Sequence, residues 1–328
     1  MARPAAHDDP RRGRRHRRPS PRPAARRRRR RAPGDRSRAM IANRPGPALA
    51  LAATLACVLE AGAEKVGNVT PTHAFPDMRF SDFVGSAAVL GPAIAEARPG
   101  RVGWAIFKAV AAARRVVPTN THLGVALLLA PIAAAWRVRR GQTLRTRVAR
   151  VLAGLGRDDA RWAYRAIRLA RPGGLGESAA ADVRSTPAIT LRQAMALAAG
   201  RDSIAAEYAG NFGLTFTVAL PALRRAMGRG LGLLDAIAHA HLEVVAAVPD
   251  TLIARKRGRA AAEAVSARAR QVLGKGGWHT RAGRVAAARL DRRLRRDGNR
   301  LNPGTSADLI AASLFVWLLD TGPRLAGR

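Results

Sequence analysis

Residues 118–136 read PTNTHLGVALLLAPIAAAW and join a polar start to a long apolar run. The Thr, Asn and Thr at 119–121 are residue types that cap helix N-termini, and Leu, Ala, Val and Ile dominate residues 123–136. Because the run is apolar on every side, it predicts a helix enclosed by others rather than one on a surface. It is shorter than the ~18–20 residues of a membrane span and contains Pro131. We therefore expect it at the centre of a folded domain.

The rest of the composition also favours helices. Hydrophobic residues make up 48% of the 328 residues and aromatic residues only 4%, while β-branched runs are short. Two further apolar runs, 48–59 and 309–319, also predict buried helices. No stretch alternates polar and apolar residues for long enough to predict a strand. The predicted fold class is all-α.

Helical spacing of apolar residues starts at Pro47, and Gly and Pro separate the segments. The predicted helices cover 47–64, 80–97, 102–115, 122–139, 143–154, 158–170, 189–209, 231–247, 251–273, 279–296 and 305–320. No repeat of fixed period and no linker divides residues 45–322. We expect a single multi-helix domain over that range.

Residues 1–44 consist largely of Arg, Pro and Ala, so we expect a disordered basic tail there. Met40 stands just before the first helical pattern, which leaves open whether translation starts there or the tail is genuine. The formal charge is +36, yet only four of the 58 basic residues are Lys, as in a GC-rich coding sequence. Arg-rich surfaces suit polyanions, either a nucleic acid or a small polyphosphate such as ATP.

Cys57 is the only cysteine, which excludes a disulfide within the chain and a zinc site built from several cysteines. No continuous apolar signal segment precedes residue 40. We expect a cytoplasmic protein without a membrane partner. Its oligomeric state stays open.

The first polar cluster contains Glu60 and Glu64, four residues apart on one predicted helix face, followed by Lys65 and Asn68. Carboxylates in the last turn of a helix oppose its dipole at about 0.3–1 kcal/mol each, so a cation should lie nearby. That cation is either Lys65 in a structural pair or a bound Mg²⁺. A ribose hydroxyl is a further candidate for the carboxylates.

The stretch before the central apolar run offers more cap residues than one helix needs. A single cap would suffice, but Asn120 and Thr121 stand beside Thr119 and His122. Free N–H groups at a helix start also bind phosphate. Capping and ligand binding both remain open for this stretch.

Two later clusters can also be interpreted either as local structure or as a ligand site. Asp250 precedes a predicted helix that carries Arg255 and Lys256, which fits either an Mg²⁺ and phosphate site or a local ion pair of about 0.5 kcal/mol. Thr305 and Asp308 form a variant capping box, which local structure alone would explain.

Two other patterns predict no site. Asp235, His239 and Glu243 share a helix face, but one helix rarely supplies a whole metal site. The glycines within 172–176 and 228–232 follow helical patterns, so neither run is a phosphate loop or dinucleotide fingerprint.

Taken in order, seven stretches between about residues 48 and 320 resemble the triphosphoribosyl-dephospho-CoA synthase family. They are Glu-Lys-x-Gly-Asn at 64–68, Phe-Ser-Asp-Phe at 80–83, Asn-Thr-His-Leu-Gly at 120–124, Gly-Gly-Leu-Gly at 173–176, Arg201-Asp202, Asp250-Thr251 with Arg255-Lys256, and Asn-Pro-Gly-Thr-Ser-Ala-Asp at 302–308. The family is all-helical and Mg²⁺-dependent. It joins the ribose of ATP to the 2′-hydroxyl of 3′-dephospho-CoA and releases adenine, so the resemblance implies a catalytic domain with ATP, Mg²⁺ and that acceptor.

The resemblance also implies roles for the polar clusters. The candidates for the base and Mg²⁺ ligands are Glu60, Glu64, Asp202, Asp250 and Asp308, with Glu64 and Asp250 as the expected metal ligands. The candidates for phosphate and ribose contacts are Lys65, Asn68, Asn120, Thr121, Arg255, Lys256 and Thr305.

The sequence departs from the family pattern at Val66, where Pro is common, and at His122, where Asn is common. Its sequence at residues 123–129 and 250–256 is similar to that of a family branch linked to tetrahydromethanopterin-type one-carbon metabolism. A nucleotide-dependent transferase with a different acceptor is therefore an alternative. A basic helical protein that binds nucleic acid, largely through its tail, is another.

Overall fold

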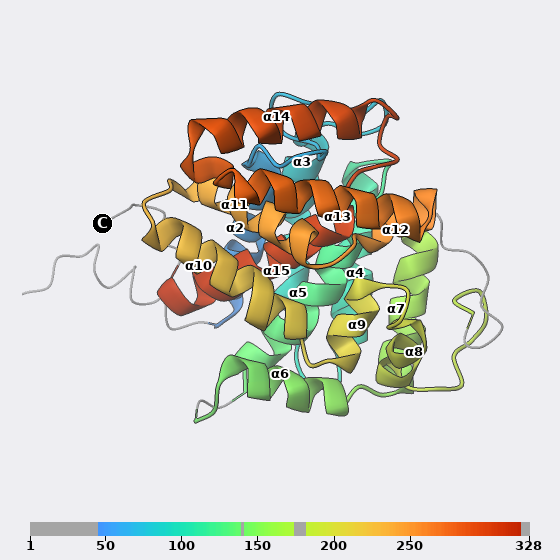
Figure 1. Cartoon of the computed structure of the whole chain (residues 1–328). Coiled ribbons are helices and arrows are strands. Elements are labelled where there is room, and N and C mark those ends of the chain that lie inside the picture. The colour runs from blue at the N-terminus through green and yellow to red at the C-terminus, as the bar shows by residue number, and fades with distance from the viewer. Residues whose placement is uncertain (1–44, 139–140, 174–181, 323–328) are drawn as a thin grey trace, which may run out of the picture. The chain divides into compact units, whose positions relative to one another are not determined.

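The computed structural model describes residues 45–138, 141–173 and 182–322, and these form helices joined by turns and loops (Figure 1). The helices are α2 (Pro45–Gly62), α3 (Phe80–Ile94), α4 (Val102–Val116), α5 (Leu123–Trp136), α6 (Leu144–Ala153), α7 (Arg157–Ala170), α8 (Leu191–Ala198), α9 (Ser203–Ala209), the π-helix η1 (Thr215–Ala219), α10 (Leu220–Gly228), α11 (Leu233–Ala247), α12 (Thr251–Arg257), α13 (Arg259–Gly274), the 3₁₀-helix η2 (Gly277–His279), α14 (Arg281–Arg295) and α15 (Gly304–Thr321). Within these ranges the only β-type pairing is an isolated bridge between Phe75 and Met78. The all-α prediction is confirmed.

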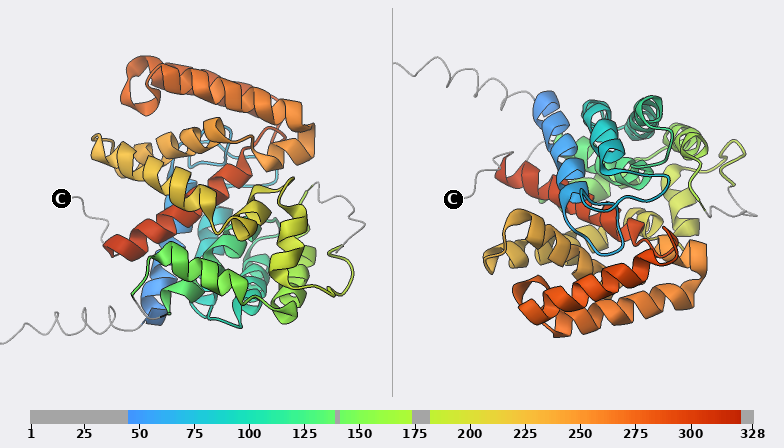
Figure 2. Two further views of the ribbon diagram at one scale, coloured as in Figure 1. Left: turned by 60° about the horizontal axis from the view of Figure 1, so that its bottom comes forward. Right: turned by 90° about the horizontal axis from the view of Figure 1, so that it is seen from above.

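Helices α5 and α15 form the centre. Every residue from Val125 to Ala135 on α5 is buried, and α15 is buried along almost all its length. The α15 helix contacts α2, α5, α10 and α11, so one continuous core surrounds it. Figure 2 shows α15 crossing the molecule between the earlier helices and the α10 to α14 layer. The two most uniformly apolar runs of the sequence thus form the helices that contact the most other helices.

Helix α14 lies on the outside, beside α13 (Figures 1 and 2). Its buried positions, Gly283, Ala287, Leu290 and Leu294, recur every three or four residues and make one narrow stripe. Arginines fill six of its other eleven positions, and five of these arginines are exposed. This spacing is that of an amphipathic surface helix.

The helices differ most from the sequence prediction in three places. The predicted helix 189–209 is two helices, because the side chain of Asp202 caps a new start at Ser203. The predicted helix 251–273 is also two, since Gly258 adopts a φ of +86° that breaks the helical path. The π-helix η1 and helix α10 were not predicted.

Among the described residues, no single helix is both long and apolar enough to cross a membrane. Helices α11 and α12 meet that length and composition only as a pair, and the chain bends by 58° between them.

Candidate active site

A cavity of about 960 Å³ lies where four helix starts meet, those of α5, α9, α12 and α15. Parts of α7, α8 and the connection between α2 and α3 complete its wall. The volume is at the upper end of the range for small-molecule sites. It is therefore large enough for a ligand of nucleotide size.

The starts of α12 and α15 are joined by a single side chain. Oδ1 of Asp250 accepts hydrogen bonds from the backbone N–H groups of Leu252 and Ile253, at 2.9 and 3.1 Å, and so caps α12. Its Oδ2 accepts from the backbone N–H and the hydroxyl of Ser306 on α15, at 2.7 and 2.8 Å. Asp250 does not line the cavity. Both carboxylate oxygens are engaged in holding the two helices together.

The start of α9 is tied to the same place. Oδ1 of Asp202 caps α9 through the N–H of Ile204 at 2.8 Å, and Oδ2 pairs with the guanidinium of Arg255 on α12. The hydroxyl of Thr251 accepts from the N–H of Ser203 and donates to the hydroxyl of Thr305, both at 3.2 Å. These contacts place Asp202, Arg255 and Thr305 together on the cavity wall.

The start of α5 meets α15 at a glycine. Oδ1 of Asn120 accepts from the N–H of Leu123, the first residue of α5, at 3.2 Å. The carboxylate of Asp308 lies so close to Gly124 that a Cβ there would be 2.1 Å from Oδ2. Gly124 therefore makes room for Asp308 beside the first turn of α5. Asn120, Thr121 and Asp308 all line the cavity.

Asp308 is the carboxyl whose charge is least compensated. It accepts no hydrogen bond from any residue within the described ranges, and burial raises its pKa well above the ordinary value. The nearby carboxylates of Glu60, Asp250 and Asp202 raise this pKa further, against a smaller lowering by Arg255. A proton on Asp308 or a bound cation would relieve the repulsion.

Glu60 faces the cavity from the end of α2 and is paired with a buried lysine. The Nζ of Lys65 lies 3.0 Å from its carboxylate and donates to the backbone carbonyls of Glu60 and Ala63. Burial raises the pKa of Glu60, and Lys65 offsets part of the rise. Lys65 itself is only 1% exposed and does not line the cavity. The structural pair, one of the two alternatives for this cluster, is present.

The connection from α2 to α3 carries Glu64 away from the cavity. Both oxygens of its half-exposed carboxylate accept from the hydroxyl of Thr72 at 3.0 Å, and the ring of His73 lies 3.7 Å away. The expected metal ligands Glu64 and Asp250 are thus not brought together. Local contacts account for the positions of both.

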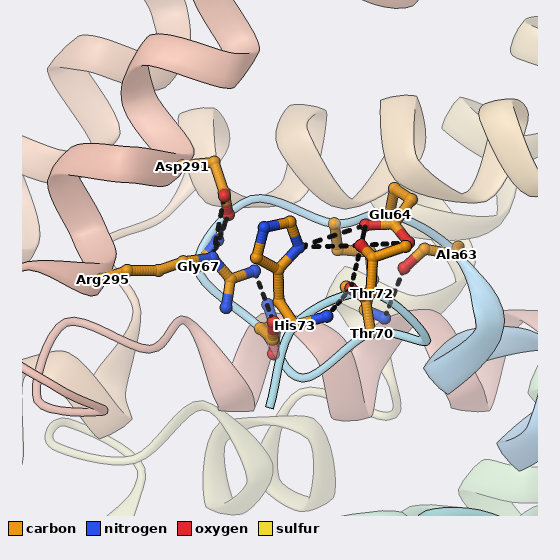
Figure 3. A network of polar contacts seen from close by, with 10 residues as sticks. Ala63, Glu64, Gly67, Thr70, Thr72, His73, Asp291 and Arg295 are labelled. Carbon is orange, nitrogen blue, oxygen red and sulfur yellow. Dashed lines mark hydrogen bonds and ion pairs between the residues drawn. The ribbon is translucent and has the colours of Figure 1, made fainter. Parts of the chain in front are cut away.

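The same connection is fastened to α14. Asp291 accepts from the N–H of Gly67 at 2.7 Å, and Arg295, paired with Asp291, donates to the carbonyl of Asn68 at 2.7 Å (Figure 3). The side-chain amide of Asn68 lies 3.2 Å from Nε2 of His241. These contacts fix Asn68, which lines the cavity.

Lys256 lines the cavity, and a chain of contacts that the sequence did not predict holds its ammonium group in place. Its Nζ donates to the backbone and side-chain oxygens of Asn299, at 3.1 and 3.3 Å, and the amide of Asn299 donates to Asp77 at 3.2 Å. Burial lowers the pKa of Lys256, with Asp77 acting against the shift. Both partners lie far from Lys256 in sequence, so local spacing could not reveal them.

Four buried polar atoms on cavity-lining residues have no hydrogen-bond partner among the described residues. They are Oγ1 of Thr119, Nε2 of His122, Nε of Arg255 and Oδ1 of Asn302. An unpaired buried polar atom costs about 1–3 kcal/mol. A ligand in the cavity would supply partners for these four atoms.

Most of the predicted site residues share this cavity. Those that line it are Glu60, Asn68, Asn120, Thr121, Asp202, Arg255, Lys256, Thr305 and Asp308, while Glu64, Lys65 and Asp250 do not. Of the predicted Gly-rich stretch 173–176, only Gly173 is among the described residues, and it also lines the cavity. No group of three or more His, Cys, Asp or Glu in the described part of the chain is arranged to hold a metal by itself.

The chain is similar to known proteins of one family. Residues 47–325 match the model of the family described as ATP:dephospho-CoA triphosphoribosyl transferase. A Klebsiella pneumoniae protein named 2-(5″-triphosphoribosyl)-3′-dephosphocoenzyme-A synthase is 35% identical over 99 residues, which cover 30% of this chain and 35% of that protein. A Pseudomonas aeruginosa (strain UCBPP-PA14) protein given the same name provisionally is 38% identical over 108 residues, 33% of this chain and 35% of that protein.

The similarity to these curated relatives spans about a third of their length. Among solved structures, the fold is similar to that of an Archaeoglobus fulgidus protein provisionally titled a triphosphoribosyl-dephospho-CoA synthase. The TM-score is 0.56 at 26% identity, and the match covers 73% of this chain and 99% of that one.

Proposed function

Because the chain belongs to the ATP:dephospho-CoA triphosphoribosyl transferase family, we propose that it joins the triphosphoribosyl group of ATP to the 2′-hydroxyl of 3′-dephospho-CoA and releases adenine. The observation that carries the proposal is the single cavity where four helix starts meet. It combines cations, an uncompensated carboxyl and unpaired polar atoms, which are the groups such a reaction needs.

The cationic side of the cavity suits the triphosphate. Arg201, Arg255 and Lys256 line it, and Nε of Arg255 is a buried donor without a partner among the described residues. Guanidinium groups bind phosphate through paired hydrogen bonds, whereas a lysine acts as a point charge. The first turns of α5 and α15 add the positive ends of two long helices. We assign the triphosphate to this side.

The chemistry requires one bond to break and one to form at the anomeric carbon. The bond from C1′ to the adenine nitrogen breaks with its electron pair on adenine, and the acceptor oxygen forms the new bond to C1′. Adenine then needs a proton, and the acceptor hydroxyl must lose one.

The reaction needs one proton donor and one proton acceptor, and Asp308 and Glu60 differ in the protonation state that each favours. Asp308 has no cation directly bonded to it among the described residues, so its raised pKa favours the protonated form, which can donate to the leaving adenine. Burial also raises the pKa of Glu60, but Lys65, 3.0 Å from its carboxylate, offsets part of that rise and favours the ionised form, which can accept the hydroxyl proton. The pair of carboxyls would also stabilise positive charge that develops on the ribose.

The donor set also fits a magnesium ion bound together with the triphosphate. Mg²⁺ is commonly held by one or two carboxylates plus substrate phosphates rather than by a complete protein cage. Asp202 lines the cavity near its cations and would be the protein ligand, in place of the expected Glu64 and Asp250. The ion would neutralise phosphate charge.

The test is to incubate the full chain with ATP, Mg²⁺ and 3′-dephospho-CoA and to follow adenine release and product mass. Adenine with a triphosphoribosyl adduct of the acceptor is the expected result. A folded protein that binds ATP but releases no adenine with this acceptor would overturn the acceptor assignment and leave the nucleotide site standing.

A further inference from the structure

His122 is the buried residue whose contacts define most closely what a ligand must provide. It precedes the first residue of α5, is 3% exposed and lines the cavity. Its ring packs edge-on against Phe83, with centroids 5.3 Å apart and planes at 80°. The ring is therefore fixed by packing, and only its two nitrogens remain to be assigned.

The nitrogen Nδ1 faces Ser86 on α3, at 2.8 Å from its hydroxyl oxygen. Ser86 also lies 2.7 Å from the backbone carbonyl of Asp82 and accepts from the hydroxyl of Thr121 at 2.8 Å. A serine hydroxyl has a single proton, and the carbonyl can only accept. Ser86 therefore donates to Asp82 and must accept from His122, which places the imidazole proton on Nδ1.

The other nitrogen is then a bare acceptor. Burial lowers the pKa of His122 to about 4, so the ring is neutral near pH 7 and Nε2 carries a lone pair. Nε2 is buried and has no partner among the described residues. Leaving such an acceptor unpaired is unfavourable, so a group that enters the cavity should donate to it.

We propose that Ser86 holds His122 in the Nδ1–H tautomer so that Nε2 accepts a hydrogen bond from an O–H or N–H group of the bound substrate. His122 is then a specificity-determining binding residue, and Ser86 is a positioning residue that acts through it. The inference rests on the proposed function for its choice of ligands. Two sources offer the required donor: the hydroxyl or amino groups of ATP, and those of 3′-dephospho-CoA.

The tautomer can be observed directly in the full chain labelled with ¹⁵N-histidine. The sequence has seven histidines, and His122→Gln identifies the resonances of this one. The expected long-range ¹H–¹⁵N spectrum of the free protein at pH 7 shows a neutral ring protonated at Nδ1. A ring protonated at Nε2 would overturn the proposal.

The ligand contact is tested by adding ATP and 3′-dephospho-CoA separately, with binding followed by calorimetry. The Nε2 resonance should move with the ligand that supplies the donor, which distinguishes the two sources. A bound ligand of either kind that leaves Nε2 unchanged counts against that source, and no change with both bound would overturn the contact. Failure of both to bind would overturn the proposed function, whereas the tautomer would still be decided by the free protein.

Substitutions separate a tautomer effect from a structural one. Gln at 122 can still present an acceptor near the Nε2 position, whereas Asn is too short, so His122→Asn should weaken binding about tenfold and His122→Gln much less. Ser86→Ala should weaken binding similarly in the wild type but not in the His122→Gln background, since an amide has no such tautomer. Equal losses in both backgrounds would mean that Ser86 acts structurally. His73→Asn, outside the cavity, is the matched control.

Discussion

The carboxylate of Asp308 occupies the space in which a side chain on Gly124 would begin, because a Cβ at Gly124 would lie 2.1 Å from Oδ2 of Asp308. This contact joins the first turns of α5 and α15, the two central helices. It also orients the carboxyl that we propose as the proton donor. The glycine is required by the neighbouring carboxylate rather than by its own backbone angles, since its φ is not positive.

Gly124→Ala should therefore displace Asp308 while the helices remain folded. We expect adenine release to fall by at least about tenfold, as one catalytic proton donor is misplaced, with circular dichroism and ATP binding largely retained. Gly228→Ala is the control, because no atom lies within 4 Å of a Cβ there and the change should be neutral or slightly stabilising. Full activity in Gly124→Ala would contradict the role given to this contact.

The ionisation of Asp308 should also affect how the free energy of unfolding depends on pH. Its pKa is raised in the folded protein by burial and by neighbouring carboxylates. Its contribution to stability is therefore fully present below the pKa of the unfolded chain and is lost as pH rises through the folded pKa. Asp308→Asn removes the ionisable group, so its free energy of unfolding should exceed that of the wild type increasingly as pH rises from about 4.

This expectation is checked by urea unfolding of both proteins at several pH values between about 4 and 8, alongside adenine release. The variant should be more stable at the upper end and inactive throughout. A stability difference that does not change with pH would show that Asp308 has an ordinary pKa.

Lys65 should matter for folding more than for binding. Lys65→Met leaves the buried carboxylate of Glu60 without its cation and removes the donor to two backbone carbonyls at the end of α2. Breaking a buried pair by removing one partner costs about 3–5 kcal/mol. Denaturant unfolding should report a loss of that size.

Lys108→Met is the matched control for Lys65. Lys108 pairs with Glu96 at 2.5 Å, but both side chains are about half exposed. Surface pairs contribute about 0–1 kcal/mol, so the control should change little. Equal losses for the two variants would contradict a special role for the buried pair.

Lys256, unlike Lys65, should affect ATP binding more than stability. Its ammonium group lies on the cationic side of the cavity and is held by Asn299. Lys256→Met should raise the Kd for ATP about 10-fold to 100-fold, which corresponds to about 1.5–3 kcal/mol for a charged hydrogen bond. Calorimetry at two salt concentrations checks this, because the loss should shrink as salt screens the charge.

The control for Lys256 is Lys275→Met, on an exposed lysine that does not line the cavity. An unchanged Kd for Lys256→Met would place the triphosphate elsewhere.

The sequence predicted the helical fold because its strongest signals are local. The uniformly apolar runs at 123–136 and 309–319 lie in the two buried central helices, as their composition indicates. Boundaries at Asp202 and Gly258 were missed because apolar spacing continues across both. The break at Asp202 depends on a side-chain cap, and that at Gly258 on a backbone angle.

The candidate site was only partly predictable from spacing. Asp202 and Asp250 both cap helices, yet only Asp202 lines the cavity, and no local pattern separates the two. The assignment of Glu64 failed for a similar reason, because the chain turns away from the cavity between Glu60 and Glu64. The tautomer of His122 depends on Ser86, 36 residues away on another helix. Such contacts exist only once the helices are packed.

The four helix starts around the cavity have a consequence for how such a protein evolves. Residues at these helix starts also form the cavity wall, so Asn120 and Asp202 each hold a helix start and line the cavity at once. A substitution at either position is exposed to selection for both properties. The far ends of α5 and α15 lie away from the cavity but inside the core, so packing alone constrains them.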